Sequence, residues 1–229
     1  MGLESWTPCQ RPGVRVLQGN LATLEPLDWA RHGQALFAAV GGNANADIWH
    51  YMPIGPFAEY ESFRRTLDRS RSEQQWETMV ILDAQGEVCG MASYMRIREA
   101  HGSVEIGCVA FGHRLQRTAC ATEAQKLMAA HVFDDLGYRR YEWKCNNANL
   151  ASKRAAVRFG FAFEGLFRND MVSKGESRDT AWYSIIDTEW RDVRAALDAW
   201  LLPGNFDSAG RQKKMLEDMR MQHRSRQTI

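Results

Sequence analysis

The sequence predicts an α+β fold in which a mixed, mostly antiparallel central sheet carries helices on both faces. Two observations predict this arrangement. Candidate strands follow one another through short polar turns such as "DAQGE" and "SKGESRD", as the strands of antiparallel hairpins do. A helical segment also separates two strands within residues 103–145, which is the pattern of a single β–helix–β unit.

The N-terminal part is expected to form a strand followed by two helices. Val14–Leu17 is a short candidate strand, and Leu24–Val40 carries apolar residues at roughly helical spacing. The Gly-Gly-Asn run at 41–43 should end this first helix. The aromatic segment Ile48–Phe57 is interrupted by two prolines and a glycine, so it is predicted to be a loop. Ala58–Ser72 has one apolar side and is predicted to be the second helix.

The middle of the chain is expected to supply most of the sheet. Three strands are predicted at Glu77–Leu82, Val88–Arg98 and Ser103–Phe111, because these runs are apolar and bounded by turn residues. An amphipathic helix follows and should end at Gly137. The next strand is predicted at Tyr138–Cys145.

The C-terminal part is expected to complete the sheet and cover it. A helix at Ser152–Phe159 is stopped by a glycine, and a long hairpin is predicted from Phe161–Phe167 and Thr180–Asp187. A last helix of the domain is predicted at Glu189–Leu201. The remaining segment 203–229 is polar and basic, and we expect it to be partly helical, around residues 212–221, or disordered.

The totals exclude several classes of protein. A chain of 229 residues suits one domain, which we place at residues 1–202. The net charge of +1 does not favour binding to DNA or to acidic membranes. The five cysteines are scattered without zinc spacing, so we expect free thiols in the reducing cytoplasm and no metal site. The first residues lack the basic and apolar regions of a signal peptide, and no apolar run approaches a membrane span.

The junction between the third of the central strands and the following helix has the features of a phosphate site. The first amides of a helix lack partners within the helix and carry partial positive charge. Residues 118–122 are all small, so a diphosphate can approach this backbone closely, while Gln116 and Arg117 stand at the rim. The alternative is an ordinary tight turn in which small residues serve packing.

Three segments, taken together, resemble the Gcn5-related N-acetyltransferase (GNAT) superfamily. They are "EIGCV" at Glu105–Val109, "QRTACATEA" at Gln116–Ala124 and "KCNNANLASKRAAVRFGFAFEG" at Lys144–Gly165. The last two are similar to the branch that acetylates the N-terminal alanine or serine of ribosomal proteins, and the resemblance covers about residues 12–200. Two positions depart from the family pattern: Ala119 replaces a usual glycine, and Ala156 replaces a tyrosine that often serves as general acid.

The resemblance implies an acetyl-CoA site. In this family two strands splay apart in a V, so we expect Ser103–Phe111 to part from Tyr138–Cys145 and admit the pantetheine arm between them. The turn after the first strand would wrap the pyrophosphate. The cofactor residues implied in this way are Val109, Phe111, Gln116, Arg117, Thr118, Ala119, Cys120, Ala121, Asn146, Asn149 and Ser152. The asparagines and the serine also suit a helix cap, which is an alternative role.

Glu105 is the candidate general base. Attack on a thioester requires a neutral amine, so a group near the acceptor must take a proton. Strand alternation places Glu105 on one face with Gly107 and Val109, and Gly107 leaves room for a substrate or a water molecule. The alternative is a structural carboxylate without a role in catalysis.

The acceptor is the least determined part of the prediction. Trp49, His50 and Tyr51, in the aromatic loop, are expected to line the acceptor pocket, unless these rings only cover the sheet. The leading function is acetyl transfer to a primary amine, either a small molecule or a polypeptide N-terminus. Alternatives are a non-catalytic acyl-CoA-binding module, or transfer of a larger acyl group such as succinyl if a cation meets its carboxylate. A homodimer is compatible with the sequence.

Overall fold

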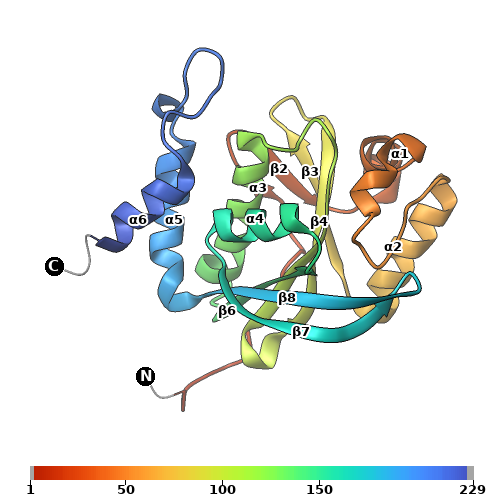
Figure 1. Ribbon diagram of the computed structural model, residues 1–229, viewed down its shortest axis with the longest axis horizontal. Coiled ribbons are helices and arrows are strands. Elements are labelled where there is room, and N and C mark those ends of the chain that lie inside the picture. Colours follow the sequence, from red (N-terminus) through yellow and green to blue (C-terminus); the bar gives the residue numbers. More distant parts are fainter. Residues whose placement is uncertain (1–2, 226–229) are drawn as a thin grey trace.

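The computed structural model describes residues 3–225 and contains one eight-stranded sheet with helices on both faces (Figure 1). The strand order is β1-β2-β3-β4-β5-β6-β8-β7. Every neighbouring pair is antiparallel except β5 and β6, which are parallel. The predicted α+β fold with a mostly antiparallel sheet is therefore confirmed.

The elements follow one another in the predicted order, with two additions near the N-terminus. The strands are β1 Leu17–Gln18, β2 Ala22–Pro26, β3 Glu77–Asp83, β4 Val88–Arg98, β5 Ser103–Phe111, β6 Arg140–Asn146, β7 Ala162–Ser173 and β8 Glu176–Ile186. The α-helices are α1 Trp29–Val40, α2 Tyr60–Gln74, α3 Ala119–Ala130, α4 Leu150–Phe159, α5 Asp187–Leu201 and α6 Leu216–Ser225. Short 3-10 turns lie at η1 Asn43–Trp49, η2 Glu99–His101 and η4 Pro203–Asn205, and a π-helical turn, η3 His131–Asp135, continues α3.

The N-terminal prediction was wrong in detail. The segment predicted as the start of a helix, from Leu24, instead forms β2, which pairs with β3, and only Leu17 of the predicted first strand is in β1. The helix begins after Asp28, whose carboxylate accepts hydrogen bonds from the amides of Ala30 and Arg31 at 2.8 and 3.2 Å. This N-cap satisfies helix amides that otherwise have no partner, and it marks the true boundary.

Two other boundaries differ from the prediction. The hairpin strands are longer, because β7 and β8 extend to a tight turn at Lys174 and Gly175, both with positive φ. The predicted aromatic loop Ile48–Phe57 is also shorter, because its first residues, up to Trp49, belong to η1. Neither difference changes the order of the sheet.

Alternating side chains divide the sheet between two apolar cores. In β3, Met79 and Ile81 join a core with α3 and α5, whereas Val80 and Leu82 join a core with α1 and α2. This is the two-residue period of a strand that is buried on both faces. Among the described residues, the α1–α2 core contains none from β6 or β8, so that half of its face carries other side chains.

Much of the segment after residue 202 packs onto the domain. Leu216 is fully buried and Met219 nearly so, both in the core that contains α5. The Trp200 indole donates to Gln212 Oε1 at 2.8 Å. The helix expected around residues 212–221 begins at Leu216, and residues 226–229 of the predicted tail lie outside the described part.

None of the helices in residues 3–225 has the length and apolar character needed to cross a membrane.

The α1–α2 core predicts a measurable stability. Leu36 on α1 is fully buried there, so Leu36→Ala should lower the free energy of unfolding by about 2–5 kcal/mol through lost contacts and a cavity. Urea denaturation followed by circular dichroism measures this. The control is Leu150→Ala, at the exposed start of α4, which should change the free energy by about 0.5 kcal/mol or less. An equal loss in both variants would contradict the assignment of Leu36 to a packed core.

Candidate active site

Strands β5 and β6 part midway along their length. Their parallel pairing ends at Ile106 opposite Trp143, although β5 continues to Phe111 and β6 to Asn146. Beyond that point β5 pairs only with β4, and β6 only with β8. The facing edges of the two strands therefore leave backbone N–H and C=O groups without a strand partner, and the V-shaped splay is present.

A β-bulge at Cys108 lies at the mouth of this splay. Cys108 has a φ of 45°, and the pairing with β4 shifts between Gly107 and Ala110. The extra residue reverses the alternation, so Val109 turns toward the core that contains α3 while Glu105 and Gly107 stay on the other face. The prediction that Val109 shares a face with Glu105 was therefore wrong, because regular alternation does not survive a bulge.

The turn before α3 presents a set of free amides. Thr118 is the N-cap, and its Oγ1 accepts a hydrogen bond from the Ala121 amide at 3.1 Å. In residues 3–225 no hydrogen-bond partner exists for the amides of Arg117, Ala119 and Cys120. These donors stand at the positive end of the helix, so this backbone suits the diphosphate of a CoA molecule.

The two polar side chains at the rim have different positions. Gln116 Nε2 donates to the Phe111 carbonyl at 3.0 Å, so this side chain ties the turn to the end of β5. Arg117 is exposed, with a φ of 63°, and its guanidinium is in no ion pair within the described residues. Arg117 is therefore the rim residue that is free to meet a phosphate.

The residues predicted on the β6–α4 side form local caps. Asn146 Oδ1 accepts from the Ala148 amide at 2.9 Å, and Asn149 Oδ1 accepts from the Ser152 amide at 3.0 Å. Ser152 Oγ accepts from the Trp143 indole at 2.9 Å. Only the oxygens of these asparagines are engaged, so their Nδ2 groups are free among the described residues to donate to a cofactor arm.

Glu105 lies in an ion network on the face of β5, β6 and β8. It is 3% exposed, forms a short ion pair with Arg96, and lies 3.0 Å from Lys144 Nζ. Lys144 also pairs with Glu142 at 2.7 Å and lies 3.8 Å from the centre of the Trp182 ring. Both carboxylates of this network are therefore held by cations, and Lys144 is shared between them.

Glu142 is the structural anchor of this network. Burial raises the pKa of Glu142, but hydrogen bonds from Lys144 and Arg140 outweigh burial and hold it at about 2. Arg98 is a third partner at 2.9 Å. Glu142 therefore stays ionised and saturated with donors, which leaves Glu105 as the carboxylate with more freedom.

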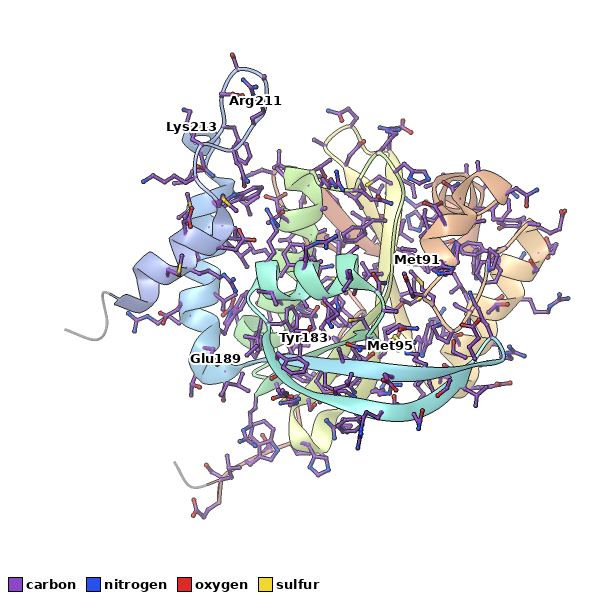
Figure 2. All side chains as sticks on the ribbon, in the orientation of Figure 1. Met91, Met95, Tyr183, Glu189, Arg211 and Lys213 are labelled. Atoms are coloured by element: carbon purple, nitrogen blue, oxygen red, sulfur yellow. The ribbon has the colours of Figure 1, made fainter. Side chains whose placement is uncertain are left out.

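The space beside Gly107 is occupied by Met95. A Cβ atom on Gly107 would lie 2.4 Å from Met95 Sδ and 3.2 Å from Glu105 Oε1. Figure 2 labels Met95, which lies on β4. The Met95 thioether thus fills the space that a side chain at Gly107 would take, and this unbranched side chain is the group that must move to admit a substrate there.

The three residues predicted for the acceptor pocket are not equivalent. Trp49 is fully buried in the α1–α2 core, and its indole donates to the Val40 carbonyl at 2.6 Å. His50 is exposed and stacks edge-on against Tyr51 with centroids 4.5 Å apart. Lys174, at the tip of the β7–β8 hairpin, donates to the Trp49 carbonyl at 2.7 Å, so the hairpin is tied to this loop.

Sequence reasoning missed the cations around Glu105. They are Arg96, Lys144 and Arg178, on β4, β6 and β8. One signal was available: Lys144 opens the third family-like segment, and alternation along β6 places it on the face of Glu142. The other two are brought close only by the order of strands in the sheet.

Comparison with known proteins identifies the family. A family model described as an acetyltransferase (GNAT) domain matches residues 22–162. The chain belongs to the GNAT acetyltransferase family. It is therefore an acyltransferase, and enzymes of this family use acetyl-CoA.

Individual relatives extend the likeness beyond the matched residues. A crystal structure of a GCN5-related N-acetyltransferase from Brucella melitensis is 44% identical, with a TM-score of 0.90 over 96% of this chain and 100% of that one. An uncharacterized N-acetyltransferase, p20, of Bacillus licheniformis is 26% identical over 64% of this chain and 84% of its own. A Salmonella typhimurium acetyltransferase that modifies the N-terminal serine of ribosomal protein L7/L12 is 20% identical, over 75% of this chain and 99% of its own, and its TM-score of 0.65 shows the shared fold.

The free amides of the turn predict that an acidic residue at Ala119 weakens CoA binding without lowering the stability of the protein. Ala119→Asp places a carboxylate at the helix N-terminus, where it stabilises α3 but repels a diphosphate. We expect the dissociation constant for CoA to rise by about tenfold or more, since two unit charges at 4 Å interact by about 1–4 kcal/mol near a protein surface. Isothermal titration calorimetry measures the constant, and thermal denaturation checks that the melting temperature does not fall.

The matched control at this position is Ala119→Gly, which restores the usual residue of the family and should leave CoA binding within about threefold. Unchanged CoA affinity in Ala119→Asp would place the diphosphate elsewhere.

Proposed function

We propose that the chain transfers an acetyl group from acetyl-CoA to a primary amine, either a small molecule or the N-terminus of a polypeptide. The observation that carries the proposal is that β5 holds the buried Glu105 where the β5–β6 splay begins and then leads into the turn whose amides are free. The Salmonella relative, which acts on a ribosomal protein N-terminus, supports the polypeptide as one acceptor class. In the reaction, the amine nitrogen bonds to the acyl carbon, the thioester C–S bond breaks, CoA leaves as the thiol, and the amine loses a proton.

The backbone would hold the cofactor. Amides of Arg117, Ala119 and Cys120 would bind the diphosphate, and the unpaired edge of β5 at Val109 and Phe111 would bond to the pantetheine arm. Asn146, Asn149 and Ser152 would line the β6 side of the same splay, with the amide nitrogens of the asparagines as free donors. Acetyl-CoA would supply an activated acetyl group as a thioester. The bulge at Cys108 lies where backbone amides can stabilise developing charge on the thioester oxygen.

Glu105 would accept the proton from the acceptor amine, directly or through a water molecule. Its Oε2 is held by Arg96 and Lys144, so Oε1 is the atom that is left for a proton. Both cations also hold the carboxylate in place beside the splay. His50 and Tyr51 remain our candidates for the acceptor side, while Trp49 would act by supporting the loop from beneath.

One observation favours a second function, a non-catalytic acyl-CoA-binding module. Ala156 stands where the family often has a tyrosine general acid, and it is fully buried in the core. No acid therefore reaches the leaving thiolate from this position. A thiol is a good leaving group with an ordinary pKa of about 8.5, so this absence slows turnover less than loss of a base would.

The test is CoA release from acetyl-CoA with two acceptor sets, small amines and peptides that begin with Ser or Ala. Turnover with either set supports the enzyme and identifies the acceptor class. Tight binding of acetyl-CoA without turnover in both sets would favour the binding module.

Glu105→Gln separates the two functions further. Loss of a positioned general base typically costs about 10²–10⁴-fold in rate, so kcat should fall by this much while the affinity for CoA stays unchanged. The matched control is Glu142→Gln, which removes a carboxylate from the same Lys144 but has both of its oxygens held by cations, so neither is left for a proton. Glu142→Gln should lower the free energy of unfolding but leave kcat closer to the wild-type value than Glu105→Gln does. Equal kcat losses in both variants would mean that Glu105 acts only through the ion network.

A further inference from the structure

Arg178 is a buried cation that has no carboxylate partner in the described part of the chain. It lies on β8, opposite Met171 of β7, and is 8% exposed. Its Nε donates to Thr180 Oγ1 at 3.2 Å, and in residues 3–225 its guanidinium is in no ion pair and no other hydrogen bond. Its two terminal nitrogens retain some contact with solvent, since neither is among the fully buried unpaired atoms.

The neighbouring carboxylates are already occupied. Glu105 is held by Arg96 and Lys144, and Glu142 by Lys144, Arg98 and Arg140. Asp170, on the exposed strand β7, interacts with Arg178 only at longer range. The charge of Arg178 is therefore left over in a network that pairs its other cations.

The strand register places Arg178 at the open end of the splay. β6 ends with Asn146 opposite Thr180, and Arg178 lies two residues farther along β8, on the same face as Trp182. Its charge acts on groups from both sides of the splay, namely Cys145 on β6 and Glu105 on β5. The guanidinium thus lies past the end of β6 and within electrostatic range of Glu105.

A second unpaired donor lies on the same face of β8. The indole Nε1 of Trp182 is buried and has no hydrogen-bond partner among the described residues. Trp182 is packed between Phe167, whose ring stacks at 4.5 Å, and Lys144. Arg178 and Trp182 together present N–H donors on this face of β8, and apart from the bond to Thr180 no side chain within residues 3–225 accepts from them.

The ligand that fits these donors is a carboxylate. A guanidinium is a planar fork of N–H donors that matches the two oxygens of a carboxylate, and it is more weakly hydrated than an ammonium group. Burial lowers the pKa of Arg178, which shows that its charged form is poorly solvated where it stands. A bound anion would restore that lost solvation, and a cationic ligand would be repelled.

We propose that Arg178 binds a carboxylate carried by one of the two substrates. This inference rests on the proposed function and narrows it. The carboxylate belongs either to the donor, as in a dicarboxylic acyl thioester such as succinyl-CoA, or to the acceptor, as in an amino acid or a peptide with an acidic side chain. Arg178 selects the substrate, and Glu105 keeps the proton transfer.

The test compares carboxylate-bearing substrates with neutral ones of matched size. In the donor arm, CoA release from succinyl-CoA is compared with release from butyryl-CoA. The acceptor in both reactions is the same amine, which carries no charged group other than the amine itself. In the acceptor arm, acetyl-CoA is used with amino acids and with their carboxamides. We expect kcat/KM to favour the carboxylate by about tenfold or more in one arm, as a desolvated charge pair does. A ratio near one in both arms would overturn the proposal.

Two variants assign the preference to this side chain. Arg178→Met keeps an unbranched chain without the charge and should bring the ratio to about one, while Arg178→Lys should keep part of it, because a lysine retains the charge and loses the fork. The control is Arg168→Met, an exposed arginine of the same hairpin, which should keep the wild-type ratio. A preference that survives in Arg178→Met would contradict the assignment.

Calorimetry makes the test independent of turnover. Wild type and Arg178→Met are each titrated with succinyl-CoA and with butyryl-CoA. Their CoA complexes are then titrated with an amino acid and with its amide. The ratio of the affinities in each pair gives the same preference without catalysis. Selective binding of the carboxylate, lost in the variant, supports the role of Arg178 even if no acetyl transfer occurs, in which case the proposed function fails alone. Turnover with no selectivity in rate or binding sinks this inference and leaves the proposed function standing.

Discussion

The candidate site depends on the absence of hydrogen bonds between β5 and β6 beyond Ile106 and Trp143. Backbone N–H and C=O groups in a protein interior need partners, and a sheet that opens midway leaves two facing edges unsatisfied. The flanking pairs, β4 with β5 and β6 with β8, hold the opening rigid from outside. β5 leads into the turn with the free amides before α3, so a ligand in which an extended arm continues into a diphosphate suits both.

The two sides of this opening carry different arrangements of charge. The helix end and Arg117 present positive charge at the phosphate side, whereas the other face carries paired Glu105 and Glu142 with surplus cations. Arg178 is the surplus cation that the sheet buries. A cationic acceptor with no carboxylate meets little uncompensated negative charge here, which argues against polyamines and for amines that carry an anionic group or react with an anionic donor.

The features that could be predicted from the sequence are those that depend on neighbouring residues. The small residues at 118–122 predicted a close turn into a helix, and glycines and turn residues predicted most element ends. Other features depend on pairing between distant segments. The bulge at Cys108 is invisible in an unbroken apolar run, β2 was too short to show a period, and Arg178 meets the splay only because β8 inserts between β6 and β7. Burial of Trp49 likewise reflects the α1–α2 core rather than its loop.

The most direct test of the central claim is a crystal structure of the chain with CoA bound. The account predicts diphosphate oxygens within hydrogen-bond distance of the Ala119 and Cys120 amides, and a pantetheine arm bonded to the β5 edge at Val109 and Phe111. A β5–β6 pair that closes along its whole length, or a diphosphate bound away from the start of α3, would contradict it.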